Sequence, residues 1–98
     1  ICYIKGVFDM SKEVSFKNRD RFVQLGVAIS TLRRIRGLSQ ESLAYKAEIS
    51  RSHLSAIEVP GTAYGFSLNV FFNIADALEA DPAELLSASV FSDKLIKK

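Results

Sequence analysis

The stretch LSQESLAYKAEISRSHLSAIE, residues 38–58, decides how this chain folds. Two of its serines, Ser39 and Ser50, each precede a run of residues that contains neither glycine nor proline. A serine in this position caps a helix, because its hydroxyl accepts a hydrogen bond from a free backbone N–H of the first turn. We therefore predict two short helices, from Ser39 to about Glu48 and from Ser50 to about Glu58, joined by a tight turn.

The second of these helices has two faces of different composition. With about 100° between successive residues, Leu54 and Ile57 lie on an apolar side together with Ser50. The opposite side is short and polar and consists of Arg51, Ser52, Ser55 and Ala56. Small side chains allow a helix to enter the DNA major groove, and an arginine can donate two hydrogen bonds to a guanine. The same composition also fits an ordinary solvated helix face, so the face alone leaves both interpretations open.

The flanking sequence predicts three more helices. In the region 20–36 apolar residues recur at the spacing of one helix face, and Gly37 then provides a helix end. Ser67 can cap a fourth helix, and Asp81 followed by Pro82 marks the start of a fifth. The expected apolar stripes are Phe22, Leu25, Ile29 and Leu32 in the first helix and Leu68, Phe71, Phe72, Ala75 and Leu78 in the fourth.

Length and composition limit the alternatives. A chain of 98 residues with 48% hydrophobic and 24% charged residues suffices for one domain and is too short for two cores. We therefore expect an all-α fold, a compact five-helix bundle. Its domain should span residues 20–87, preceded by a leader at 1–19 that partly represents upstream sequence and followed by a C-terminal tail at 88–98.

The chain has few side chains for catalysis or metal binding. One cysteine and one histidine cannot provide the about three or four protein ligands of a zinc site, and no disulfide can close within the chain, which fits a reducing cytoplasm. His53 has no serine, cysteine or carboxylate arrangement that would form a triad with it. No uncharged stretch reaches the roughly 20 apolar residues of a membrane span. We therefore expect no enzyme activity, metal, cofactor or membrane segment.

The charge is unevenly distributed, although the net charge is only +2. Residues 1–58 carry ten basic and six acidic side chains, whereas residues 59–98 carry three and five. From Lys17 to Arg36 six basic residues accompany a single acid, Asp20. Such a patch can meet a polyanion, or it can be an ordinary solvated helix face.

One set of residues along the chain matches the sequence pattern of a known protein family. It consists of Leu38, Ser39, Gln40, Leu43, Ala44, Ile49, Ser50, Leu54, Ile57 and Glu58, with the runs Ala75–Leu78 and Asp81–Leu86. In these residues the chain resembles the lambda-repressor-like helix-turn-helix family, the Cro and phage-repressor or XRE-like type, over about residues 22–87. Among small members it resembles the controller proteins of restriction-modification systems, through residues 43–46 and 51–58.

This resemblance implies a transcriptional regulator that binds double-stranded DNA sequence-specifically, with helix 50–58 in the major groove and Gln40 on a phosphate. The residues that would meet base edges or flanking phosphates are Ser50, Arg51, Ser52, Ser55 and Ala56. The family pairs a basic residue near the end of its first helix with the acid that ends its third, here Arg33 and Glu58. We expect no small-molecule effector, because the sequence shows no effector domain.

Useful specificity requires two copies, because a domain of this size reads only a few base pairs. We therefore expect a homodimer on a palindromic operator. The C-terminal residues carry more apolar side chains than a free tail needs, which predicts a dimer interface formed by Leu85, Leu86, Val90, Phe91 and Leu95. The alternative is an antitoxin-type module that binds a protein partner and uses its DNA binding for autoregulation.

Two segments depart from the family pattern. At Glu48 the family usually has glycine or asparagine, because this turn residue often adopts a left-handed conformation. The segment 59–67 carries no positive charge, so phosphate contacts there would come from backbone or hydroxyl groups. Within this segment Tyr64 could contact DNA, although packing of the loop is the favoured interpretation.

Overall fold

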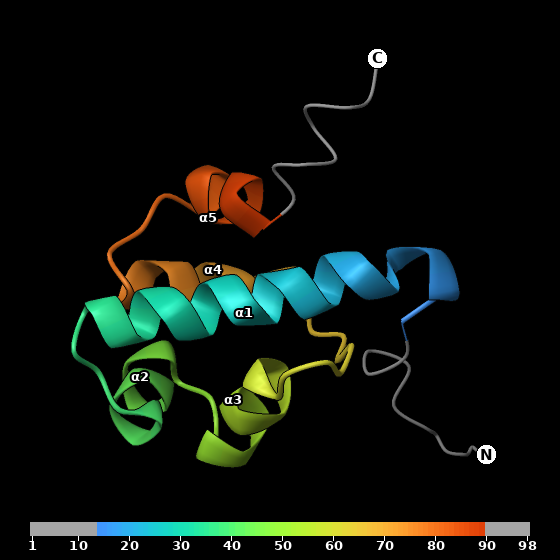
Figure 1. Cartoon of the computed structure of the whole chain (residues 1–98). Helices are drawn as coiled ribbons and strands as arrows, with labels where there is room; N and C mark the ends of the chain where they lie inside the picture. Colours follow the sequence, from blue (N-terminus) through green and yellow to red (C-terminus); the bar gives the residue numbers. More distant parts are fainter. Residues whose placement is uncertain (1–13, 90–98) are drawn as a thin grey trace.

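In the computed structural model, which describes residues 14–89, the first helix packs against the third and the fifth, while the second packs against the third and the fourth (Figure 1). The helices are α1 (Arg19–Ile35), α2 (Gln40–Ala47), α3 (Arg51–Glu58), α4 (Leu68–Ala77) and α5 (Pro82–Ser89). Helices α2 and α3 lie side by side below α1 in the view of Figure 1, whereas α5 lies above it. No strand occurs within residues 14–89, so the predicted all-α fold with five helices is confirmed.

Four of the five helices begin where local capping signals predict. The hydroxyls of Ser39, Ser50 and Ser67 accept hydrogen bonds from the backbone N–H three residues later, at 3.0, 3.0 and 3.1 Å. The Asp81 carboxylate accepts one from the N–H two residues later at 3.0 Å. Gly37 follows α1 with φ of 76°, the left-handed conformation expected just beyond a helix end.

The segment before α1, which we expected to be a leader, contains a short helical turn. A short 3-10 helix, η2 (Phe16–Asn18), lies directly before Arg19, the first residue of α1. The Asn18 N–H donates to the Ser15 carbonyl at 2.9 Å. This turn was not predicted, because the polar residues here have only weak apolar periodicity.

The core contains residues from all five helices. Its buried members are Leu25, Ile29, Leu43, Ala44, Ala47, Leu54, Ile57, Phe71, Ile74, Ala75, Leu78 and Leu85. The stripe predicted for α4 was partly wrong, because Leu68 and Phe72 are 69% and 47% exposed while Ile74 is buried. Phe72 follows Phe71 about 100° further around the helix, which turns its ring away from the core.

Gly26 lets α1 and α3 approach each other closely. It is buried, and a Cβ atom added to it would overlap with the backbone carbonyl oxygen of Ile57. Only a residue without a side chain fits such a contact between two backbones. The distance between α1 and the C-terminal end of α3 is therefore set by main-chain atoms.

Candidate nucleic-acid interface

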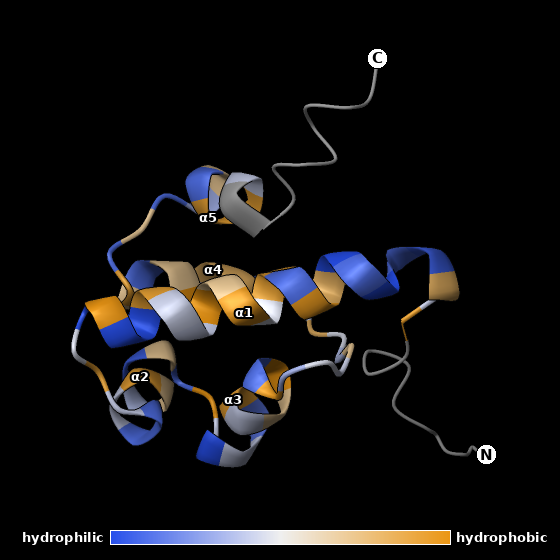
Figure 2. Ribbon diagram, viewed as in Figure 1, coloured by the Kyte–Doolittle hydropathy of each residue, from blue (hydrophilic) through white to orange (hydrophobic). Residues whose placement is uncertain are grey.

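Helix α3 presents a polar face on the side of the bundle that is opposite to α1. Figure 2 shows hydrophilic residues on the side of α2 and α3 that faces away from α1. Four residues predicted to meet DNA share a shallow hollow with Val59: Arg51, Ser52, Ser55 and Ala56. Arg51 and Ser52 are exposed, whereas Ser55 and Ala56 are half-buried. The long arginine therefore stands at the N-terminal end of a surface of short side chains.

Ser50 lies at the start of the same helix, but its hydroxyl is already used. It accepts the hydrogen bond from the His53 N–H that caps α3, at 3.0 Å. The side chain is nevertheless exposed, so the hydroxyl hydrogen can still be donated to a base or a phosphate.

The turn between α2 and α3 has the geometry that the family pattern predicts. Glu48 adopts φ of 62° and ψ of 40°, the left-handed conformation. The N–H of Ile49 donates to the carbonyl of Ala44 at 3.0 Å, which closes the end of α2. Glutamate therefore occupies a conformation that costs a residue with a side chain about 1 to 2 kcal/mol.

A buried ion pair joins α1 to the C-terminal end of α3. Arg33 Nε donates to Glu58 Oε2 at 2.9 Å, and Arg33 Nη2 donates to Glu58 Oε1 at 3.1 Å. Arg33 Nη1 donates to the Leu38 carbonyl at 2.7 Å. The two charged side chains are only 10% and 3% exposed. The structure thus brings together the two residues that the resemblance pairs, and it supplies partners for an arginine on the apolar side of α1.

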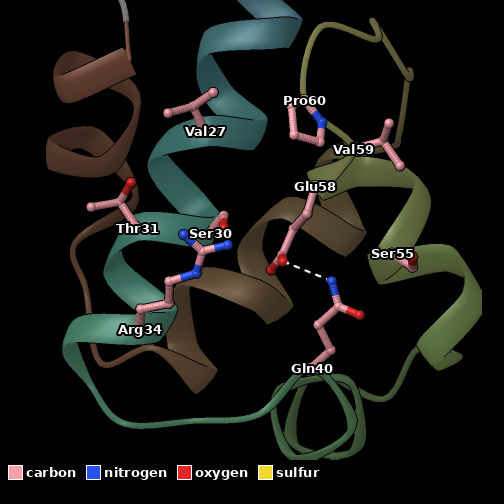
Figure 3. A pocket seen from close by; sticks show the side chains of 9 residues that line it. All are labelled: Val27, Ser30, Thr31, Arg34, Gln40, Ser55, Glu58, Val59 and Pro60. Carbon is pink, nitrogen blue, oxygen red and sulfur yellow. Dashed lines mark hydrogen bonds between the residues drawn. The ribbon is translucent and has the colours of Figure 1, made fainter.

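Gln40, the first residue of α2, joins this network. Its Nε2 atom donates to Glu58 Oε1 at 3.0 Å, as the dashed line in Figure 3 shows. The side chain is half-buried and its orientation is fixed by a carboxylate that Arg33 also holds. The residue expected on a DNA phosphate therefore lies at the edge of the network that positions α3.

A cavity of about 330 Å³ lies beside this network, between α1 and α3 (Figure 3). The α1 wall consists of Val27, Ser30, Thr31 and Arg34. Gln40, Ser55 and Glu58 line the opposite side. Arg34 is exposed, and within residues 14–89 its guanidinium has no hydrogen bond or ion pair. Arg34 belongs to the basic stretch from Lys17 to Arg36, but the cavity depends on how α1 and α3 are arranged, and no sequence signal reveals that.

Other arginines of the basic stretch are engaged within the protein. Arg19 donates to a backbone carbonyl of the loop after α3 at 3.4 Å, and Arg36 donates to the Leu78 carbonyl at the end of α4 at 2.8 Å. Arg21 donates to the side chain of Asn18 at 3.0 Å. Much of the predicted polyanion-binding stretch is thus used to hold the fold together.

The loop after α3 is packed through Tyr64. This ring is half-buried against the core and meets the ring of His53 edge-on, with 5.7 Å between the ring centroids. Tyr64 therefore has the packing role that the sequence favoured.

Within residues 14–89 no group of three or more histidine, cysteine, aspartate and glutamate side chains could hold a metal ion. No helix in this range is long and apolar enough to cross a membrane.

The prediction for the dimer interface needs a correction at Leu85. This side chain is 4% exposed and contributes to the protomer's own core, so it was wrong to assign it to a partner surface. It faces inward because α5 packs along α1. Leu86 is 46% exposed. The other members of the predicted interface, Val90, Phe91 and Leu95, lie outside the described residues.

Two short helices joined by a left-handed turn, with the second one polar and exposed, define a DNA-binding helix-turn-helix domain. Residues 24–88, more than half of the chain, match the helix-turn-helix domain family. The chain belongs to this family of DNA-binding helix-turn-helix transcription regulators.

Solved structures show which regulators the chain is similar to. The restriction-modification controller protein C.AhdI from Aeromonas hydrophila is 34% identical, with 65% of this chain and 94% of that chain covered and a TM-score of 0.60. The clp gene regulator ClgR from Corynebacterium glutamicum is 25% identical, with 76% and 78% covered and a TM-score of 0.68. The controller protein C.Esp1396I shares the fold at 21% identity, with 79% and 97% covered and a TM-score of 0.67. No curated protein matches the chain significantly.

Proposed function

We propose that this regulator binds a palindromic DNA operator as a homodimer, with α3 of each protomer in the major groove of one half-site. The observation that carries this proposal is the exposed polar face of α3. The Arg33–Glu58 pair fixes the helix itself against α1. Two such helices related by a two-fold axis meet half-sites about one helical turn apart. The operator symmetry then follows from the symmetry of the protein.

Each residue of the face has a role that fits its chemistry. Arg51 has the reach and the fork of donors for a guanine, and losing one such contact costs about 1 to 3 kcal/mol. Ala56 can touch a thymine methyl group, and the hydroxyls of Ser52 and Ser55 can bond to a base or to the backbone. Ser50 and Gln40 stand at the N-terminal ends of α3 and α2, where helices bind phosphates.

We infer the process that this regulator controls from a similar protein of known structure. C.AhdI is a restriction-modification controller, and the identity of 34% supports the same role for this chain. We infer control by protein concentration in the cytoplasm, without a cofactor or a small-molecule effector. Dimerisation linked to DNA binding makes occupancy of the operator depend steeply on that concentration.

Selection from random duplex DNA followed by gel shift at two salt concentrations tests the DNA binding. We expect a palindromic site whose affinity falls steeply with salt. Arg51→Ala should lose the preference at one position of each half-site. Arg51→Lys is the matched control, because it keeps the charge and removes the bidentate fork; it should lose the same base preference and keep the salt dependence. Equal site preference in all three proteins would refute the assignment of α3 as the recognition helix.

Sedimentation tests the homodimer. Phe91→Asp should shift the protein toward monomer and weaken operator binding, because the proposed partner surface consists of Leu86, Val90, Phe91 and Leu95. An unchanged dimer would move the interface elsewhere on the protomer. A wild-type protein without any enriched DNA site would instead favour the antitoxin-type function, in which the fold serves to bind another protein.

A further inference from the structure

We infer that Arg34 holds a backbone phosphate of the operator in the cavity between α1 and α3, together with the Gln40 end of α2. The inference rests on the proposed DNA binding and adds to it a contact from α1, outside the helix-turn-helix unit. Three observations lead to it: the position of the cavity, its charge, and the engagement of the neighbouring Arg33 and Arg36 within the protein.

The cavity lies next to the polar face of α3, the surface that would read bases. Ser55 and Val59 line both this cavity and the hollow on the polar face of α3. A helix in the major groove is flanked by the sugar-phosphate backbones that form the walls of that groove. A backbone that passes along the Gln40 side of α3 therefore runs over the mouth of this cavity.

The charge of the cavity favours an anion despite the carboxylate of Glu58 in its wall. Both oxygens of Glu58 accept hydrogen bonds from Arg33, and Oε1 also accepts one from Gln40. The carboxylate is thus neutralised from behind, at 3% exposure. The guanidinium of Arg34 is then the net charge that faces the space, and the N–H groups of the first turn of α2 add a positive helix end.

The need for such a contact follows from the loop after α3. Residues 59–67 contain no lysine or arginine, so this loop offers no cation to the DNA backbone. Arg33 is committed to Glu58, and Arg36 donates to carbonyls at the end of α4. Arg34 lies between these two engaged arginines, and its guanidinium has no partner within residues 14–89.

The test compares Arg34→Gln with Arg36→Gln on the selected operator. Both variants lose one positive charge from the end of α1, but Arg36 lies against α4 on the other side of the helix. We expect Arg34→Gln to bind on the order of tenfold more weakly, with unchanged base preference and a salt slope reduced by about one. Arg36→Gln should keep the wild-type slope, and Arg34→Lys should restore part of the affinity. Thermal melting confirms that all variants are folded.

Ethylation interference locates the contact. Neutralising single phosphates should reveal one phosphate in each half-site that matters to the wild type and no longer matters to Arg34→Gln. If Arg34→Gln and Arg36→Gln behave alike, or if the interference pattern does not change, the phosphate contact is overturned. These outcomes differ from a failure of the proposed function, in which the wild type selects no site and Arg51→Ala has no effect.

Discussion

The surface around α3 and the surface around α4 and α5 expose opposite kinds of side chain. The α3 side exposes Arg51 and short polar residues and buries its apolar ones. The other side exposes large apolar side chains, including Leu68, Phe72 and Leu86. Short polar groups and one arginine suit a hydrated, charged polymer, whereas exposed leucine and phenylalanine suit another protein surface. The bundle therefore places the polar face that we propose for DNA and the exposed large apolar side chains on different helices.

The two surfaces also differ in how their helices are fixed. Besides its core residues Leu54 and Ile57, helix α3 is held by a buried ion pair and by a contact between two backbones at Gly26. Helices α4 and α5 are held by apolar side chains such as Phe71, Ile74 and Leu85. Apolar packing tolerates small shifts, whereas hydrogen-bonded charges and main-chain contacts allow one arrangement. The structure thus allows the least freedom in the position of α3 relative to α1.

The largest effect is expected from breaking the ion pair. Glu58→Ala leaves the charge of Arg33 buried without its partner, which should lower the free energy of unfolding by about 3 to 5 kcal/mol. The double variant Arg33→Met with Glu58→Leu should recover most of this loss, because apolar residues of similar size suit a buried site. Urea unfolding followed by circular dichroism measures both. A single variant as stable as the wild type would show that the pair does not hold α3.

The next effect is expected at Gly26. Gly26→Ala introduces a methyl group where the Ile57 carbonyl lies, so the two helices must separate, at a cost of about 1 to 3 kcal/mol. Gln24→Ala, at an exposed position of the same helix, is the control and should change stability by less than about 0.5 kcal/mol. Thermal unfolding compares the two. Equal melting temperatures would mean that α1 and α3 do not depend on this contact.

Two left-handed glutamates, one on each side of the molecule, give a direct comparison. Glu48 follows α2 with φ of 62°, and Glu79 follows α4 with φ of 57°. Glu48→Gly and Glu79→Gly should each stabilise the fold by about 1 kcal/mol, because glycine adopts this conformation without strain. Calorimetry measures the gain, and a gel shift should show unchanged base preference for both. A loss of stability at either position would reveal that its glutamate side chain makes a stabilising contact.

The smallest effect is expected from the exposed side of α4. Phe72→Ser should change the free energy of unfolding of the isolated domain by less than about 0.5 kcal/mol. Phe71→Ala is the neighbouring control and should cost about 3 to 5 kcal/mol, since that ring is buried. Chemical unfolding at low protein concentration separates the two. A large loss at Phe72 would place this ring in the protomer's core rather than on a free surface.

The starts of α2, α3, α4 and α5 were predictable from sequence, because the capping signals that mark them are local. Each of Ser39, Ser50, Ser67 and Asp81 bonds to a backbone N–H within the next three residues, so a short window of sequence contains both partners. The separation of α3 into a polar and an apolar face was predictable for the same reason, since it depends only on the helical period.

The features that were not predictable depend on how the helices cross. The burial of Leu85 and the exposure of Phe72 follow from the rotation of α5 and α4 against the bundle, and a stripe of apolar residues leaves that rotation undetermined within about one position. The cavity beside Arg34 is lined by residues of α1, α2 and α3, so it depends on how these three helices are arranged. The pairing of Arg33 with Glu58 spans 25 residues, and only the family resemblance indicated it.

The backbone contact at Gly26 has a consequence for the redesign of the recognition surface. Because main-chain atoms set the spacing between α1 and α3, this spacing does not depend on which side chains the outer face of α3 carries. New residues at Arg51, Ser52, Ser55 and Ala56 therefore alter the chemistry offered to the groove while the axis of the helix stays in place. Under the proposed function, a change of only a few codons on this face would give the protein a new target sequence while its fold stays the same.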